Sequence, residues 1–155
     1  LELSMTVAHD AGRKVSLTLS DSFCVQRFRD EFRNLAENTV DILFGNEDEM
    51  LALYEVDTIE EALRHLRDRC EIVAVTRGAQ GSLIASGGEL YEVAAEPVGA
   101  VVDTTGAGDA YAAGFLHGLT HGLSLPECGR LGSIAGAEVI SHLGARPQTS
   151  LAALR

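Results

Sequence analysis

Strand patterns that alternate with segments of helical spacing are the feature that most constrains how this chain can fold. Strands are predicted at three places, 14–20, 40–44 and 71–76. The segments after them carry apolar residues at helical spacing, at 22–38, 46–54 and 58 to about 69. Strands that alternate with helices form mostly parallel sheets that helices cover on both faces. The sequence therefore predicts a three-layer α/β fold.

The second half of the chain adds a hairpin to this pattern. Gly87-Gly88 separates two strand-like segments, 82–86 and 89–94, and such a glycine pair is typical of a two-residue hairpin turn. The apolar run at 98–102 predicts one more strand, directly before a glycine-rich stretch. The sheet is therefore expected to be parallel apart from one antiparallel hairpin.

Two further helices are predicted from their end signals. Residues 1–11 indicate the end of a helix, with Gly12 as its terminator. Residues 124–127 form a capping box that opens a helix running toward His142, with Gly144 expected as its C-terminal cap. With no internal repeat and no linker-like segment in the 155 residues, we expect one domain or part of one.

The composition excludes several classes of partner. Twelve basic and twenty-three acidic side chains give a net charge of −11, which argues against nucleic acid or an anionic membrane as the main partner. No apolar run approaches the length that spans a membrane. The three cysteines are widely spaced and include no Cys-x-x-Cys pair, which indicates reduced thiols in a cytoplasmic protein.

Residues 103–111 (DTTGAGDAY) carry the clearest chemical signal. They follow the apolar run and lead into a helical pattern, so their small residues leave the first N–H groups of a helix accessible. Such a helix start binds phosphate readily. Asp109 would repel that phosphate unless it had another role, which suggests a base facing a hydroxyl nucleophile. The alternative is a tight turn in which Asp109 only complements the helix N-terminus.

Other known motifs do not match. No Gly-Lys-Ser/Thr follows the glycines, so the stretch is not a P-loop, and Tyr111 occupies the third glycine position of the dinucleotide fingerprint. His117 and His121 have a spacing seen in zinc sites, but no Glu follows His117, so we interpret them as ordinary helix histidines. The chain has no Gly-x-Ser-x-Gly elbow that would supply an esterase nucleophile.

Two more polar junctions follow predicted strands. Asn46 and Glu49 share one helical face and are suited to order water around magnesium, but taken alone this segment is fully explained by a capped helix start with acidic charge in its first turn. The loop from Thr76 to Gly81 would admit a nucleotide close to its backbone, although a structural turn is equally consistent. Because ligands of such sheets bind beyond the carboxyl ends of the strands, we expect these junctions and the stretch at 104–109 to form one site.

In combination these motifs resemble a known family. DTTGAGDAYAAGF looks like the second signature of the ribokinase-like (phosphofructokinase B) family of carbohydrate and nucleoside kinases. NEDE resembles its Asn-x-x-Glu motif, and TRGAQG its Thr-x-Gly-x-x-Gly nucleotide loop. The order and spacing agree over roughly residues 14–147.

The resemblance implies a role for each matched residue. Asp109 would be the catalytic base, and the backbone amides of Gly106, Ala107 and Gly108 would form the anion hole. Residues for nucleotide and magnesium would be Thr76, Gly78, Gly81, Asn46 and Glu49. A monovalent cation, expected to be K⁺, would be bound by Asp103 and Thr105 together with carbonyls near Val139, His142 and Gly144.

The implied function is transfer of a phosphoryl group from ATP, with Mg²⁺, to the hydroxymethyl group of a nucleoside or sugar. The runs VDILFGNEDE and LPECGRLGSIAGAEVI look more like adenosine kinases than ribokinases. A sugar kinase of the ribokinase or fructokinase type and a non-catalytic nucleotide-binding module of the same fold remain as alternatives. A vitamin or hydroxymethylpyrimidine kinase is less favoured, because of the DTTGAGD form and the Asn46/Glu49 pair.

The resemblance covers only the nucleotide-binding part of the family. We therefore expect residues 1–155 to be the C-terminal portion of one ribokinase-like domain, without the acceptor-binding N-terminal half and its lid. A homodimer formed through that lid is the expected assembly. The 155-residue chain alone is expected to show no kinase turnover, because it lacks an acceptor pocket.

Overall fold

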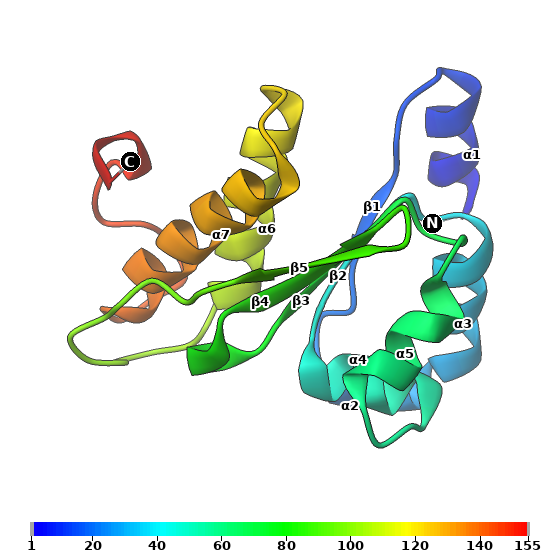
Figure 1. Cartoon of the computed structure of the whole chain (residues 1–155), viewed down its shortest axis with the longest axis horizontal. Coiled ribbons are helices and arrows are strands. Elements are labelled where there is room, and N and C mark those ends of the chain that lie inside the picture. The colour runs from blue at the N-terminus through cyan, green and yellow to red at the C-terminus, as the bar shows by residue number, and fades with distance from the viewer. Residues whose placement is uncertain (1, 155) are drawn as a thin grey trace. The chain divides into compact units, whose positions relative to one another are not determined.

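The computed structural model describes residues 2–154 (Figure 1). The first elements along the chain are α1 (Glu2–Asp10), β1 (Ser16–Thr18), α2 (Ser22–Arg27), α3 (Arg29–Asn38), β2 (Ile42–Asn46), α4 (Glu47–Tyr54), α5 (Ile59–Leu66) and β3 (Ile72–Thr76). They are followed by the 3-10 turn η1 (Gly78–Gln80), β4 (Ser82–Ser86), β5 (Glu89–Val93), α6 (Ala107–Thr120), α7 (Leu125–Ile140) and the 3-10 turn η2 (Leu151–Leu154).

The five strands form one mixed sheet whose hydrogen-bonded order is the sequence order, β1-β2-β3-β4-β5. Strands β1 and β2 are parallel, with Ser16 opposite Ile42 and Thr18 opposite Phe44. Strands β4 and β5 are joined by Gly87 and Gly88, both with positive φ, which confirms the predicted hairpin. The α/β class predicted from the alternation of patterns is therefore present.

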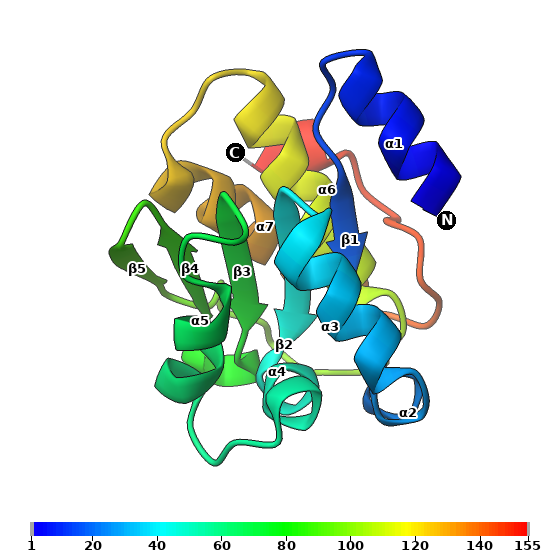
Figure 2. The same cartoon turned by 90° about the vertical axis from the view of Figure 1, so that its right-hand side faces the viewer.

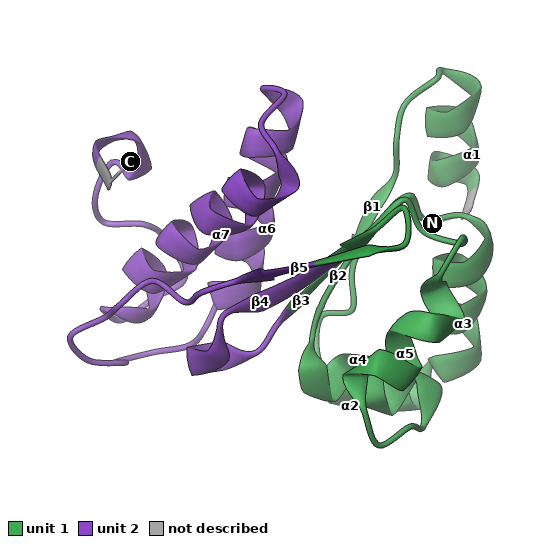
Figure 3. Cartoon of the chain, viewed as in Figure 1, with its two compact units in different colours: residues 1–75, 85–90 green, residues 76–84, 91–155 purple. Residues whose placement is uncertain are grey.

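The chain divides into two compact units (Figure 3). Unit 1 contains residues 1–75 and 85–90, and in it α2 to α5 lie on one side of β1 to β3 (Figures 1 and 2). Its core is built by the inner faces of these elements, where the fully buried side chains include Val25, Leu43, Met50, Leu53, Leu66 and Val75.

Unit 2 contains residues 76–84 and 91–155, and its main feature is the helix pair α6 and α7. A connection of only four residues joins the two helices, so they pack as antiparallel neighbours (Figure 1). Glycines line their contact. A side-chain carbon at Gly114 would lie 2.5 Å from the carbonyl oxygen of Leu131, and one at Gly132 would lie 2.8 Å from the ring of Tyr111. The close approach holds the middles of the two helices together, and the start of α6 lies beside the second half of α7, where Ala107 is near Gly136.

The segment predicted as a single helix at 22–38 is two helices. The chain breaks at Phe28, with φ −124° and ψ 39°, between α2 and α3. Tertiary contacts explain the break, because Arg29 and Arg33 of α3 donate to the carbonyls of Ala52 and Leu53 at the end of α4. These bonds set the direction of α3, which local helical periodicity does not encode.

Four other predicted elements differ from expectation. The strand predicted at 40–44 lies two residues later, at Ile42–Asn46. The strand predicted at 14–20 is confined to Ser16–Thr18, and the helix predicted to about residue 69 ends at Leu66. The run at 98–102 is not a strand at all. Val101 and Val102 are 59% and 51% exposed, so this apolar segment follows the surface of unit 2.

Two of the predicted helix ends are confirmed, and one is wrong. Gly12 follows α1 with φ +66°, and Ser124 and Glu127 form the reciprocal capping box of α7. That helix, however, ends at Ile140 with Ser141 as its C-cap, so Gly144 lies beyond the cap and has a different role.

The three cysteines are free thiols, of which Cys128 is buried and the other two are half-buried. Within residues 2–154, no helix has the length and apolar character needed to cross a membrane.

The α6–α7 contact yields a stability prediction. Replacing Gly114 with Ala should destabilise the protein. A contact of 2.5 Å with the backbone carbonyl of Leu131 lies at the upper end of the about 1–3 kcal/mol that overpacking costs, and this outweighs the ~1 kcal/mol by which Ala favours a helix over Gly. Gly136→Ala in α7 is the control, since its new carbon would lie at an ordinary 3.6 Å from Ala107. Urea unfolding followed by circular dichroism measures both, and a Gly114→Ala protein as stable as the unchanged one would contradict the proposed packing.

Candidate active site

The N-cap of helix α6 is a glycine, so no side chain caps the start of this helix. Gly106 is its N-cap in the left-handed conformation, with φ 80° and ψ 3°. The N–H of Ala107 donates to the carbonyl of Thr104 at 3.1 Å. Over the described residues, the N–H groups of Gly108 and Asp109 have no hydrogen-bond acceptor, so the helix start presents unsatisfied donors. Of the three amides expected in the anion hole, that of Ala107 is thus already engaged. We call residues 103–109 the anion loop.

Asp109 lies in the first turn of α6, and its side chain is exposed. Over the part of the chain that the structure describes, its carboxylate takes part in no hydrogen bond or ion pair. The positive end of the helix dipole stabilises its charge without occupying its oxygens. A carboxylate held in this way is free to accept a proton from a molecule bound in front of it.

A pocket of about 170 Å³ lies in unit 2, next to this helix start. Its wall includes five residues predicted for the site, namely Thr76, Gly78, Gly81, Ala107 and Gly108. The sequence reading missed the rest of the wall, which is formed by Ala95, Glu96, Tyr111, Ser133, Gly136, Ala137 and Ile140. The run of small residues in α7 was the available signal, since small side chains on a helix leave room for a ligand or another backbone.

The loop at 76–81 is held tightly against β5. Gly81 adopts φ 85° and ψ −132°, a conformation that only glycine enters without strain. A side-chain carbon there would lie 2.0 Å from the carbonyl oxygen of Val93. The last glycine of the loop, Gly81, is therefore required by the fold. Gly78 differs, because a side-chain carbon there would have no atom within 4 Å, so this part of the pocket wall borders open space.

A buried hydrogen bond connects α6 to the strand that follows this loop. The hydroxyl of Tyr111 donates to Oγ of Ser82 at 2.8 Å, and both residues are buried. Burial raises the pKa of Tyr111 to about 12, against the lowering effect of the Ser82 bond, so the hydroxyl keeps its proton. The bond fixes the distance between the first turns of α6 and the end of the loop.

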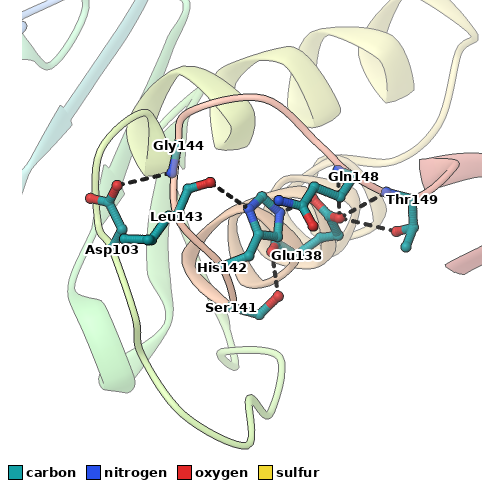
Figure 4. Close-up of polar contacts among 8 residues, drawn as sticks. All are labelled: Asp103, Glu138, Ser141, His142, Leu143, Gly144, Gln148 and Thr149. Carbon is teal, nitrogen blue, oxygen red and sulfur yellow. Dashed lines mark hydrogen bonds and ion pairs between the residues drawn. The ribbon is translucent and has the colours of Figure 1, made fainter.

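Asp103, at the other end of the anion loop, accepts hydrogen bonds from two backbone groups, of which Figure 4 shows that of Gly144. One carboxylate oxygen accepts from the N–H of Thr105 at 2.9 Å, and the other from the N–H of Gly144 at 3.0 Å. Hydrogen bonds from Thr105 and Gly144 lower the pKa of Asp103 to about 2. Of the residues expected to bind a monovalent cation, Asp103, Thr105 and Gly144 are brought together directly. Val139 is fully buried in α7, and His142 follows the end of that helix.

Asn46 and Glu49 belong to unit 1, where they form a reciprocal capping box at the start of α4. Glu49 accepts from the backbone and side-chain N–H groups of Asn46 at 2.9 and 2.8 Å, and Asn46 accepts from the N–H of Glu49 at 2.8 Å. Burial raises the pKa of Glu49. The capped helix start is therefore real, and it leaves the exposed Asn46 at the end of β2.

No group of three or more His, Cys, Asp or Glu residues suited to hold a metal occurs within residues 2–154. His117 lies in the last turn of α6, and His121 is the C-cap of that helix. Their rings lie 4.2 Å apart, and Nδ1 of His121 lies 2.7 Å from the carbonyl oxygen of His117, as a local helix-end contact.

Curated relatives with related sequences are sugar and nucleoside kinases. An uncharacterised sugar kinase of Archaeoglobus fulgidus is 42% identical over 117 residues, which cover 75% of this chain and 46% of the relative. A cytidine kinase of Thermococcus kodakarensis is 34% identical over 138 residues, which cover 86% of this chain and 49% of the relative. The chain thus spans about half the length of the curated relatives it matches.

Solved structures with the same fold include an adenosine kinase from Sinorhizobium meliloti, with a TM-score of 0.92 and 50% identity over 96% of this chain and 46% of that chain. An E. coli ribokinase II described as putative, in complex with ATP and Mg²⁺, has a TM-score of 0.84 at 25% identity, over 97% and 50% of the two chains. A fructokinase double mutant from Vibrio cholerae, bound to fructose, ADP and potassium, has a TM-score of 0.81 at 26% identity, over 98% and 52%. The ribokinase-like fold class is confirmed.

The family itself is shown by a match over nearly the whole chain. The model of the pfkB family carbohydrate kinases matches residues 1–151. This range includes the anion loop, the loop at 76–81 and the Asn46/Glu49 pair, the three motifs on which the resemblance was based. The chain belongs to the pfkB family of carbohydrate kinases.

Proposed function

We propose that this chain is the ATP-binding and catalytic-base part of a longer kinase, which phosphorylates a hydroxymethyl group of a nucleoside or sugar. The observation that carries the proposal is the Asp109 carboxylate. It is exposed and has no partner within the described residues, and it lies at a glycine-started helix that borders the pocket of unit 2. The structural alternative for Asp109 is a first-turn aspartate that only complements the helix dipole. The Asp109→Asn experiment below separates the two roles.

The pocket of unit 2 fits the nucleotide. Its wall combines the backbone of Gly78 and Gly81, the hydroxyls of Thr76 and Ser133, and the small residues of α7. Glycine and alanine positions let the phosphates and the adenine ring of ATP approach the backbone closely. The N-terminus of α6 favours the negative charge of the phosphates. We assign the phosphates to the loop at 76–81 and the start of α6, and the adenine ring to the pocket wall formed by α7.

In the proposed reaction, Asp109 accepts the proton of the acceptor hydroxyl. That oxygen forms a bond to the γ-phosphorus of ATP while the bond from this phosphorus to the β-phosphate oxygen breaks, which releases ADP. The N–H groups of Gly106 and Gly108, together with that of Asp109, have no acceptor within the described residues and would stabilise charge on the transferred group. The amide of Ala107 can join them only if its bond to the Thr104 carbonyl opens.

For the acceptor we favour a nucleoside resembling adenosine. The support is the 50% identity to an adenosine kinase structure, the match to a cytidine kinase, and the resemblance of 40–49 and 125–140 to adenosine kinases. A sugar is the alternative, favoured by the related sugar kinase. Since the chain spans about half of these relatives, we assign the acceptor pocket to the remainder of the protein and expect no turnover from the 155 residues alone. Three free thiols favour a reducing, cytoplasmic location.

Two metals belong to the proposal. Asn46 and Glu49 would order waters around Mg²⁺, which supplies charge neutralisation of the phosphates. Within the described residues, Glu49 accepts hydrogen bonds from Asn46. Glu49 is buried and Asn46 is exposed, so Glu49 would act on such waters mainly by orienting Asn46. Asp103 and Thr105 with the carbonyls near Val139, His142 and Gly144 would bind K⁺. The fit rests on Asp103, whose two oxygens already draw the Thr105 and Gly144 backbones together.

A non-catalytic nucleotide-binding module is the rival of a different class. It would need the pocket and the helix start but has no use for a free carboxylate at position 109. Titration of the longer protein with Mg-ATP, beside an assay of acceptor phosphorylation, separates binding with turnover from binding alone.

Replacing Asp109 with Asn in the longer protein should lower kcat by about 10²–10⁴-fold, because the amide cannot accept the hydroxyl proton. ATP affinity, measured by calorimetry, should stay nearly unchanged. The matched control is Asp30→Asn, which removes the same charge from the exposed first turn of α3. Turnover of the Asp109→Asn protein close to that of the control would show that Asp109 is not the base.

Glu49→Gln separates the magnesium role of this residue from its capping role. Gln also serves at this position of a capping box, so the thermal stability should change little. Removal of the charge should raise the Mg²⁺ concentration for half-maximal activity roughly tenfold, as loss of a metal's outer-shell partner does. If stability and magnesium requirement both remained unchanged, Glu49 would be a helix cap and nothing more.

A further inference from the structure

Glu138, in the last turns of α7, has a carboxylate that the proposed chemistry does not use. Only 7% of its side chain is exposed. One oxygen accepts from the N–H of Gln148 at 2.9 Å, the N–H of Thr149 at 3.0 Å and the Thr149 hydroxyl at 3.1 Å, and the other lies 3.3 Å from Nε2 of His142 (Figure 4). Burial raises the pKa of Glu138, but these hydrogen bonds outweigh it, and the pKa lies below its usual value.

These partners lie on the two sides of one irregular segment. His142 stands at its beginning, directly after α7, and Gln148 and Thr149 stand at its end. The segment has no helix or strand of its own, so backbone pairing does not fix its path. The single carboxylate of Glu138 therefore closes the segment into a loop by holding both of its ends.

The middle of that segment contacts the anion loop. The N–H of Gly144 donates to Asp103, whose other oxygen holds the N–H of Thr105. Ala145 packs against Gly106 so closely that a side-chain carbon at Gly106 would lie 2.6 Å from Cβ of Ala145. The anion loop is thus contacted by two residues, Gly144 and Ala145, of the segment whose ends bind the Glu138 carboxylate. Figure 4 shows the Gly144 contact beside the Glu138 contacts.

We propose that Glu138 is a positioning residue for the anion loop, because it holds the segment at 142–149 against Asp103 and Gly106. The inference rests on the proposed function, which gives the anion loop its task. Donors to a transferring phosphoryl group act only when they are placed accurately, and a misplacement of about 1 Å costs on the order of 10²-fold in rate. Glu138 touches no reacting atom and acts through Gly144 and Ala145.

The experiment compares three variants of the longer protein. Glu138→Ala removes the acceptor, and Glu138→Gln restores one oxygen for the Gln148 and Thr149 N–H groups. Glu127→Ala is the matched control, since Glu127 lies in the first turn of the same helix, where its carboxylate accepts from Ser124 instead. Glu127→Ala should lower stability without touching the segment at 142–149.

Glu138→Ala should lower kcat roughly 10- to 100-fold, with the KM for ATP near its normal value, and Glu138→Gln should regain most of the rate. Hydrogen exchange of residues 103–108 should be faster in Glu138→Ala than in Glu127→Ala. A kcat for Glu138→Ala no lower than that of the control, or unchanged exchange at 103–108, would overturn the inference.

The exchange measurement also separates this inference from the proposed function. If the unchanged protein phosphorylated no acceptor while Glu138→Ala still accelerated exchange at 103–108, the positioning would stand and the kinase assignment would fail. If Glu138→Ala did not fold, Glu138→Asp, which keeps the charge but shortens the reach, should give faster exchange at 103–108 and a lower kcat. Normal values of both in Glu138→Asp would count against the inference.

Discussion

The close contact between α6 and α7 is the constraint on which the candidate site depends. Where Gly114 faces Leu131 and Gly132 faces Tyr111, the helices leave no room for a further side-chain carbon. This approach lets α7 contribute Ser133, Gly136 and Ala137 to a pocket whose other walls are the start of α6 and the loop at 76–81. A wider spacing of the helices would separate these walls.

Two polar contacts complete the frame around that pocket. The Tyr111–Ser82 hydrogen bond ties α6 to the strand after the loop at 76–81, and the Asp103 carboxylate ties the anion loop to Gly144. Both contacts lie inside unit 2, and each joins two segments that are far apart in the sequence. With the backbone fixed in this way, Asp109 stays free of partners within the described residues, which is the condition for a base.

The sequence predicted those parts that local patterns encode. The hairpin at Gly87-Gly88, the capping box at 124–127 and the placement of Thr76, Gly78 and Gly81 in one loop follow from turn chemistry and motif spacing, and the structure contains them. It could not predict the break at Phe28, which depends on arginines of α3 reaching the end of α4. Nor could it reveal Glu138, because its partners lie ten and eleven residues further along an irregular segment. The strand predicted at 98–102 was wrong because this run is apolar but lies on the surface.

The central claim is that this pocket and this carboxylate belong to a kinase and not to a nucleotide-binding module. The most direct measurement incubates the longer protein with Mg-ATP and, in turn, adenosine, cytidine, ribose and fructose, and identifies products by mass spectrometry. The account predicts ADP together with an acceptor that has gained one phosphoryl group on its hydroxymethyl oxygen, most rapidly for a nucleoside. Tight binding of ATP with no phosphorylated product from any of these acceptors would contradict it.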